Sequence, residues 1–406
     1  MEKVVVTGIG ALACNGNNVH EFWNSLVNGN VGYLSNEEYL PSDFPFKLCG
    51  IVKNLKFERY LTESEIRTYD RSALLALTAT CMAIEDAQLD FSLCNRDKVS
   101  VILGSTCGTN LAVESYDFVN KWYGSNSVNE VNIAQYRHSD IPNAVSNKFS
   151  LKGSSYLEGT ACASGSHSIG EAYDLITLGE ADVVICGGAE ALNLLPLLGF
   201  KALHALAKNK CAPYDKNRDG IVIGEGAGII ILESETHALE RKAKIYTELS
   251  GWSINCDAEN ITAPVEDGTR CKELIISCLK NAGKKEKDID YISLHGTGTP
   301  KNDLAEGNGI RLALGKRGGI VPVSSIKSMI GHTFGAAGAL GSIAAILSIT
   351  KGFIPPNMNL EHIDELLKLN LISKPHTKAD IKLALSLSFG FGGCNVAILF
   401  NKYINK

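Results

Sequence analysis

The sequence predicts an α/β protein made of two halves in which strands and helices alternate. Short apolar runs followed by glycines, such as Val99 to Leu103, alternate with longer segments of helical periodicity. This alternation begins again from Lys244, and each half closes on a strand preceded by a glycine cluster, at Gly224 to Gly228 and at Gly390 to Gly393. We therefore expect the boundary between the halves near residues 233 to 250.

The composition is that of an ordinary globular protein. The chain has 406 residues, of which 45% are hydrophobic and 20% charged, enough for two units with their own cores. A net charge of −5 gives no overall positive field for nucleic acid or an anionic membrane. The 12 cysteines include no CxxC pair, a usage typical of a reduced, cytoplasmic protein. Because Met1 leads directly into a strand, we expect no secretory leader, and the apolar run from Gly338 to Thr350 is too short to span a bilayer.

The first strand is Val4 to Val6, and the glycines after it imitate a dinucleotide-binding fingerprint. Gly8 to Ala13 matches GxGxxA. However, Cys14 to Asn18 reads as a loop where the fingerprint needs a helix, and no strand ending in an acidic residue follows. The pattern therefore favours close packing in a tight strand-to-loop turn, and no nicotinamide cofactor is expected.

The next elements follow from capping and periodicity. Asn18 can cap a helix that reaches Val27, and an alanine-rich helix runs from Arg71 to Gln88. Val99 to Leu103 is a buried strand that ends in the small residues Gly104 to Gly108, which line a site or pass close to another backbone. Ile141 to Phe149 is predicted to be a helix.

Cys162 lies at a predicted strand-to-helix junction. Ser154 to Glu158 reads as a strand, and Ser168 to Leu178 has the spacing of a helix with one buried face. A thiol at a helix start lies near unpaired N–H groups and the positive end of the helix dipole, both of which favour the thiolate. The small residues around Cys162 leave room for a large electrophile, although most free cysteines are simply buried.

The rest of the first half continues the alternation. Asp182 to Glu190 is an apolar strand that ends in glycines, and Pro213 to Gly220 is a charged turn. Gly224 to Gly228 leads into the strand Ile229 to Leu232, and a helix near residues 235 to 243 closes this half.

The second half places two histidines at strand ends. His295 directly follows the strand Tyr291 to Leu294, and His332 lies shortly after the strand Val321 to Ser325. Ligands of open α/β sheets gather at the carboxyl ends of strands, where Cys162 can also be placed. A lone histidine of this kind is more often a core or capping residue. A zinc site is disfavoured because the three residues lack the short paired spacing of structural zinc and a fourth ligand, so we expect no metal.

Taken together, these motifs resemble the β-ketoacyl-[acyl-carrier-protein] synthases of the thiolase superfamily, in the synthase I/II branch. The resemblance covers essentially the whole chain. Its motifs are VVVTGIG from Val4, TACASG around Cys162, DVVICGGAE from Asp182, YDKNRDGIVIGEGAG from Tyr214, HGTGTP from His295, SIKSMIGHTFGAAGA from Ser325 and SFGFGG from Ser388.

The resemblance implies a thiolase-like five-layer αβαβα fold of two pseudo-duplicated βαβαβαββ halves. Residues 1–240 would bear the nucleophilic cysteine, and residues 241–406 the two histidines and the gate loop. It also implies a cytoplasmic acyltransferase without a cofactor that works with an acyl carrier protein. The chain would form a homodimer, or a heterodimer with a paralogue.

By matching positions, the resemblance implies roles for individual residues. Cys162 would accept the acyl group, and the N–H groups of Cys162 and Phe391 would form the oxyanion hole. His295 and His332 would hold the malonyl thioester and promote its decarboxylation, with electrostatic support from Lys327. Glu306 and Asp303 would support that site. Phe391 would be the gate of an acyl pocket whose floor includes Cys107 and Phe200.

Three alternatives share the fold. A non-catalytic chain-length factor generally lacks the nucleophile, which is present here. A degradative thiolase would use a second cysteine, and Cys394 lies near where one would look, but the motifs around it are those of the synthases. A synthase of the initiating type would have Asn in place of His332.

The chain departs from the family pattern around the gate and the carrier surface. Asn commonly stands at the position of Leu387 and Thr at that of Cys394, so the motion of the gate loop is expected to differ. In the helix that usually carries basic residues for the carrier, only Arg67 remains, and His204 replaces another basic position. The loss of these basic residues suggests a specialised carrier, as in a secondary-metabolite or polyene pathway.

Overall fold

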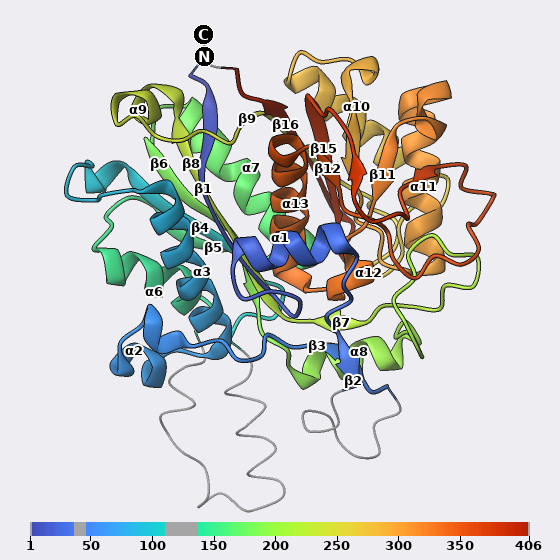
Figure 1. Cartoon of the computed structure of the whole chain (residues 1–406), viewed down its shortest axis with the longest axis horizontal. Helices are drawn as coiled ribbons and strands as arrows, with labels where there is room; N and C mark the ends of the chain where they lie inside the picture. The colour runs from blue at the N-terminus through green and yellow to red at the C-terminus, as the bar shows by residue number, and fades with distance from the viewer. Residues whose placement is uncertain (1, 36–45, 110–136, 405–406) are drawn as a thin grey trace, which may run out of the picture.

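Five layers of secondary structure make up the described part of the chain, residues 2–35, 46–109 and 137–404 of a computed structural model (Figure 1). Helices α3 and α6 form one outer layer and pack on strands of the N-terminal half. Helices α7 and α13 lie in the middle and contact strands of both halves. Helices α10 and α11 form the other outer layer. The expected αβαβα arrangement is confirmed.

The helices and strands of the described residues have the following bounds. The helices are α1 (Val19–Asn28), α2 (Glu63–Thr68), α3 (Arg71–Ala87), α6 (Asp140–Phe149), α7 (Ser164–Thr177), α8 (Leu194–Ala202), α9 (Glu235–Glu240), α10 (Thr269–Asn281), α11 (Pro300–Leu314), α12 (Lys327–Ile330) and α13 (Ala337–Lys351). The strands of the main sheet are β1 (Val4–Ala13), β4 (Val99–Gly104), β5 (Ser155–Glu158), β6 (Val183–Glu190), β8 (Gly226–Ser234), β9 (Thr247–Cys256), β10 (Tyr291–Ser293), β11 (Pro322–Ser324), β13 (Asn370–Leu371), β15 (Leu383–Phe389) and β16 (Cys394–Lys402). Short strands outside it are β2 (Leu34–Ser35), β3 (Leu48–Gly50), β7 (Ile223–Gly224), β12 (Phe353–Ile354) and β14 (Thr377–Lys378).

The order of the strands shows the duplication that the sequence predicts. The main sheet runs β13-β11-β10-β15-β16-β9-β1-β8-β6-β4-β5. Read from its two edges toward the middle, the N-terminal order β5-β4-β6-β8-β1 is matched by β11-β10-β15-β16-β9, with β13 as an addition. The halves join where β1 pairs antiparallel with β9, from Val4 opposite Leu249 to Val6 opposite Thr247. The boundary at residues 240/241 stays a prediction.

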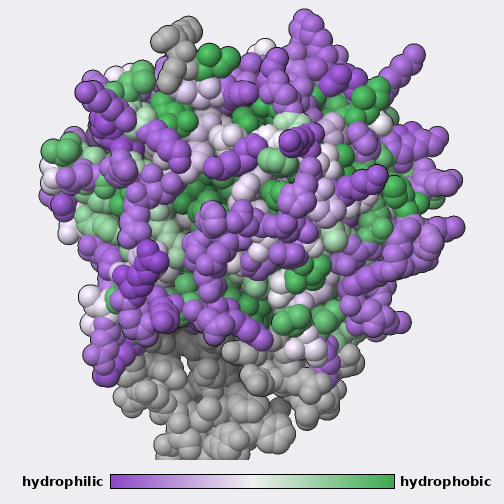
Figure 2. All heavy atoms as spheres, viewed as in Figure 1, coloured by the Kyte–Doolittle hydropathy of each residue, from purple (hydrophilic) through white to green (hydrophobic). Residues whose placement is uncertain are grey.

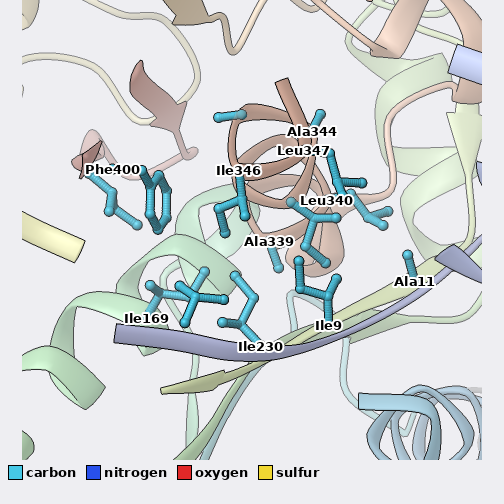
Figure 3. Close-up of a cluster of buried hydrophobic side chains, with 14 of the residues drawn as sticks. Ile9, Ala11, Ile169, Ile230, Ala339, Leu340, Ala344, Ile346, Leu347 and Phe400 are labelled. Carbon is cyan, nitrogen blue, oxygen red and sulfur yellow. The ribbon is translucent and has the colours of Figure 1, made fainter. Parts of the chain in front are cut away.

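The central helix α13 is buried between the two halves of the sheet. Figure 3 shows Leu340 and Ile346 of this helix among Ile9 and Ile230 of N-terminal strands and Phe400 of β16. All five side chains are fully buried. The shared core therefore holds the two halves together and fixes where the starts of α7 and α13 lie.

The first glycines of the chain lie inside a strand and not in the predicted turn. Because β1 extends to Ala13, Gly8 and Gly10 are strand residues that face α3. A Cβ at Gly10 would lie 1.9 Å from the carbonyl oxygen of Ala79. The expectation of close packing is confirmed, and the expectation of a tight strand-to-loop turn is wrong.

One helical stretch has the length and hydropathy of a membrane span. Among the described residues, Phe334–Lys351 passes this test, so the expectation that this apolar run is too short was wrong. However, 83% of the stretch is buried inside the protein, as expected of a core helix.

On the face shown in Figure 2, hydrophilic side chains cover much of the surface and hydrophobic ones form small separate groups.

Candidate active site

Cys162 lies in a 3-10 turn, η4 (Ala161–Ala163), between β5 and α7. Ala161 has a φ of 49°, in the left-handed region that residues with a side chain rarely adopt, so the backbone bends sharply just before the thiol. The N–H of Ala163 donates to the carbonyl of Thr160 at 3.1 Å and closes the turn. The predicted strand-to-helix junction is confirmed, and Cys162 is 5% exposed.

Burial raises the pKa of the Cys162 thiol to about 12. The ammonium group of Lys327 and the backbone N–H groups of Phe391 and Cys162 lower this pKa, but the loss of solvation is the larger effect. Backbone N–H groups therefore favour the thiolate as expected, but burial outweighs them and the pKa of the resting thiol is raised. The thiol keeps its proton, and that proton must leave when the sulfur forms a bond.

His332 is held as a neutral hydrogen-bond donor. It follows α12, and its backbone is fixed by bonds from its N–H to Val222 O at 2.7 Å and from Gly224 N–H to its carbonyl at 2.9 Å. Its Nδ1 accepts from the N–H of Phe334 at 3.1 Å, which leaves the proton of the neutral ring on Nε2. Burial, and then the charge of Lys327, lower the pKa of His332 well below its usual value.

His295 has the same protonation state for a similar reason. Burial, Lys327 and His332 lower its pKa well below the usual value. The Lys327 ammonium lies 3.5 Å from His295 Nδ1 and also donates to the His295 carbonyl, so the ring proton belongs on Nε2. The two imidazole rings meet edge to face with centroids 5.4 Å apart. The site therefore contains two neutral imidazoles, each with a free Nε2–H.

Glu306 and Asp303, both on α11, organise the turn that carries His295. Glu306 accepts from the N–H of His295 at 2.7 Å and of Gly296 at 2.8 Å, and also from the hydroxyl of Tyr214. Burial raises its pKa, and these donors oppose that effect. Asp303 accepts from Tyr214 N–H at 2.8 Å and Thr297 N–H at 3.1 Å. The two carboxylates therefore act on the backbone, a more specific arrangement than the expected general support.

Lys327 is buried at the start of α12, and burial lowers the pKa of its ammonium group. The charge of Glu306 opposes this effect most strongly, followed by that of Cys162. The positive charge of Lys327 adds to the effect of burial in lowering the pKa of both imidazoles, and it favours negative charge on the cysteine sulfur.

A cavity of about 410 Å³ brings the predicted residues together. Cys162, His295 and His332 line it, together with Phe200 and Phe391. The rings form a continuous row in the order Phe391, Phe200, Phe334, His332 and His295, with neighbouring centroids 5.0 to 5.5 Å apart. Phe391 is 39% exposed at the outer end of this row, the place expected of a gate.

The structure places some predicted site residues elsewhere. Cys107 does not line the cavity, and its N–H donates to Glu190 at 3.0 Å, so its part in the acyl pocket stays a prediction. Arg67 lies on α2 away from the cavity lining, with its side chain 77% exposed and paired with Glu63. His204 does line the cavity. In the described part of the chain, no three His, Cys, Asp or Glu side chains are grouped to hold a metal ion.

Sequence reasoning missed the buried carboxylate of Glu190 at the end of β6. It accepts from Ser105 hydroxyl at 3.0 Å, from Thr106 N–H at 2.6 Å and from Gly335 N–H at 3.0 Å, besides Cys107 N–H. Burial raises its pKa to about 7 against these four donors. The carboxylate ties the N-terminal half to the start of α13. An acidic residue at the end of an otherwise apolar strand was the signal that could have found it.

Comparison with known proteins agrees with this architecture. Residues 1–238 match the family model of the β-ketoacyl synthase N-terminal domain, and residues 246–361 match that of the C-terminal domain. The chain therefore belongs to the β-ketoacyl synthase family.

Individual relatives match over nearly the full length. The 3-oxoacyl-[acyl-carrier-protein] synthase 2 of Synechocystis sp. is 36% identical, over 99% of this chain and 98% of its own. The solved structure of the ishigamide ketosynthase/chain length factor has a chain that is 31% identical with a TM-score of 0.95, over 99% of this chain and 100% of that one. A complex of a type II PKS acyl-carrier protein with its ketosynthase, bound to the hexaketide, has a chain that is 32% identical with a TM-score of 0.90. The match covers 99% of this chain and 100% of that one.

Proposed function

We propose that this protein joins an acyl group carried on Cys162 to malonyl-acyl carrier protein by decarboxylative Claisen condensation. The product is a 3-oxoacyl-acyl carrier protein, and the reaction elongates a fatty acid or polyketide chain. The observation that carries the proposal is that one cavity contains a cysteine thiol and two neutral imidazoles, His295 and His332, whose Nε2–H groups are free.

The first half-reaction moves the acyl group to Cys162. The sulfur attacks the thioester of the acyl carrier protein, and the backbone N–H groups of Cys162 and Phe391 stabilise the tetrahedral oxyanion. The carrier thiol leaves and takes up the proton that the Cys162 thiol loses. No net base is consumed, which fits a resting thiol that burial keeps protonated by raising its pKa. The charge of Lys327 stabilises the negative charge that develops on the sulfur.

The second half-reaction uses the two histidines. The malonyl thioester loses CO2, and the electron pair of the broken bond moves into an enolate whose oxygen accepts from the Nε2–H groups of His295 and His332. The carbanion then attacks the acyl thioester on Cys162, and the cysteine sulfur leaves and regains a proton. Protonated imidazoles are not required, in agreement with the lowered pKa of both histidines.

The partners follow from the same proposal. The acyl and malonyl groups arrive on acyl carrier protein, and the chain works in the cytoplasm as a homodimer or as a heterodimer with a paralogue. Arg67 contributes to carrier docking and His204 lies at the cavity. Because only Arg67 remains basic in the sequence of its helix and His204 replaces another basic position, we expect the carrier to be a specialised one. Tight, salt-sensitive binding to a housekeeping fatty-acid carrier, measured by titration calorimetry, would count against that specialisation.

The chain-length-factor alternative is not favoured. A partner without catalysis needs no nucleophile, whereas here Cys162 lies in the cavity with both histidines.

Intact mass spectrometry tests the function directly. The protein is mixed with acyl-carrier substrates of graded length, malonyl-carrier is then added, and Cys162→Ala serves as the control. We expect acyl mass on Cys162 that is chased into 3-oxoacyl-carrier, with no adduct on the variant. An adduct that malonyl-carrier does not discharge, or no adduct at any chain length, would contradict the proposal.

A further inference from the structure

Cys256 and Cys394 face each other across two antiparallel strands. Cys256 ends β9, Cys394 begins β16, and the two are direct partners in the strand register. The next pair, Asp257 and Gly393, is hydrogen-bonded, with Asp257 N–H donating to Gly393 O at 2.9 Å. Because bonded and non-bonded pairs alternate, the cysteines form a non-bonded pair, a type whose Cα atoms are typically about 4.5 Å apart.

This separation suits a disulfide. Disulfides join residues whose Cα atoms are roughly 4.4 to 6.8 Å apart, and directly opposite side chains project from the same face of a sheet. The neighbouring pair shows that partners in this register reach each other, because Asn395 Nδ2 donates to Asn255 Oδ1 at 3.1 Å. Both cysteines are free thiols in the structure.

The two thiols differ in exposure. Cys256 is exposed, whereas Cys394 is about half-buried. Burial raises the pKa of Cys394, and the nearby Cys256 and Glu158 raise it further. Cys256 is therefore the thiol that meets a reagent first, and Cys394 is placed to react second.

The pair lies at the base of the gate loop. The Cys394 carbonyl accepts from Gly390 N–H at 2.7 Å and closes the loop, and the Cys256 thiol donates to Gly392 O at 3.7 Å. Gly392 N–H also donates to Ile261 O at 2.8 Å. A covalent bond between the cysteines would therefore join the loop that carries Phe391 to the segment after β9, which lines the same cavity.

We propose that Cys256 and Cys394 form a redox-active pair whose reversible disulfide restrains the gate loop. The pair itself is independent of the reaction at Cys162, and only its effect on acylation rests on the proposed function.

The oxidation balances with a hydroperoxide as the oxidant. The Cys256 thiolate attacks the terminal peroxide oxygen, the O–O bond breaks, and an alcohol or water leaves after taking up a proton. The Cys394 sulfur then attacks the resulting sulfenic sulfur, a disulfide forms, and water leaves with the second proton. Two thiols are oxidised by two electrons, and one peroxide is reduced. A dithiol reductant reverses the bond by exchange.

Peptide mapping tests the pair without reference to activity. Trypsin releases residues 245–270 and 383–402, which contain Cys256 and Cys394 as their single cysteines. The protein used is Cys162→Ala, so that the active-site thiol cannot react. After hydrogen peroxide treatment and alkylation, we expect one cross-linked species with the mass of both peptides less two hydrogens. It disappears with dithiothreitol and does not form in Cys256→Ser or Cys394→Thr.

Alkylation of both cysteines after peroxide treatment, or a bond of either to another cysteine, would overturn the pair. The effect on the gate is tested with Cys162 intact, using oxidised glutathione and comparing each protein with its own reduced form. We expect oxidation of the wild-type protein to slow acylation of Cys162 about tenfold or more. In Cys394→Thr, the oxidised and reduced forms should acylate Cys162 at the same rate. The gate effect would be overturned if oxidation slowed acylation equally in both proteins, or if the disulfide formed and the acylation rate did not fall. No acylation even after reduction would instead contradict the proposed function.

Discussion

The starts of α7 and α13 share a backbone conformation but carry different side chains. Each helix follows a 3-10 turn whose first residue has a left-handed φ although it is not glycine, 49° at Ala161 and 45° at Phe334 in η7 (Phe334–Ala336). The second residue of the turn is Cys162 in one half and Gly335 in the other. The duplicated fold thus provides two similar helix starts, and only the first carries a nucleophile.

The glycines of these two helices explain why the starts can lie side by side. Gly165 and Gly338 each come four residues after the left-handed residue. A Cβ at Gly165 would lie 2.5 Å from Gly335 O, and one at Gly338 would lie 2.3 Å from Ser166 Oγ. The second half contributes its histidines from the segments before α11 and α13. We infer that the N-terminal half supplies the nucleophile of the covalent step and the C-terminal half supplies the imidazoles of the carbanion chemistry.

Removing the nucleophile should have the largest effect. In Cys162→Ala, 3-oxoacyl-carrier formation should fall by at least about 10⁴-fold, because the acyl group has no sulfur to accept it. The product is quantified by mass spectrometry. Condensation at even a tenth of the wild-type rate would contradict the division between the halves.

Removing one imidazole should impair the carbanion chemistry assigned to the C-terminal half and leave acylation intact. In His332→Ala, condensation should fall about 10²- to 10³-fold, because one of two donors to the enolate oxygen is lost. Acylation of Cys162, followed by intact mass, should persist. The exposed His20→Ala is the matched control. Loss of acylation in a folded His332→Ala protein would mean that the histidine also serves the covalent step.

The two equivalent turn positions should differ in their tolerance of a side chain. A Cβ at Gly335 would lie 2.5 Å from Ser105 Cα, which is backbone and cannot move cheaply. We expect Gly335→Ala to lower the free energy of unfolding by about 1–3 kcal/mol, and Cys162→Ala to change it less. Urea unfolding measures both. A Gly335→Ala protein as stable as the wild type would remove the reason why only one turn carries a thiol.

The buried carboxylates of the two halves, Glu190 and Glu306, should give the smallest effect, a pH dependence of stability. Burial raises the pKa of Glu190 to about 7 from 4.5 in the unfolded chain, so its folded form holds a proton more tightly. The contribution of this protonated carboxyl group to the free energy of unfolding is present below about pH 4.5 and is lost as the pH rises through about 7. Glu190→Gln and Glu306→Gln should each lack part of this decline, measured by urea unfolding from pH 4.5 to 8. Unchanged slopes in both variants would contradict this.

Much of the fold could be predicted because its signals are local. Apolar runs, capping residues and glycine clusters located most strands and helices, and their repetition indicated the two halves. The glycines of β1 were misplaced in a turn because only the packing of α3 shows that Gly10 faces a backbone. The burial of the stretch Phe334–Lys351, likewise, depends on both halves folding around it.

The site was predicted in part for the same reason. Cys162, His295 and His332 lie next to recognisable strand and helix ends, and one cavity joins them. The raised pKa of Cys162 could not be read from its neighbours in sequence, because it results from burial by distant segments. The contacts of Glu190 and the pairing of Cys256 with Cys394 depend on tertiary contacts and strand register, which no local pattern gives.

Release of CO2 from malonyl-carrier by Cys162→Ala, with His332→Ala measured beside it, tests the division between the halves most directly. The account predicts that Cys162→Ala still releases CO2 although it forms no 3-oxoacyl product, because both imidazoles remain. It predicts that His332→Ala forms the acyl adduct but releases CO2 at least about 10²-fold more slowly. Equal loss of CO2 release in the two variants, both folded, would show that the cysteine and the histidine act as one unit and would contradict the account.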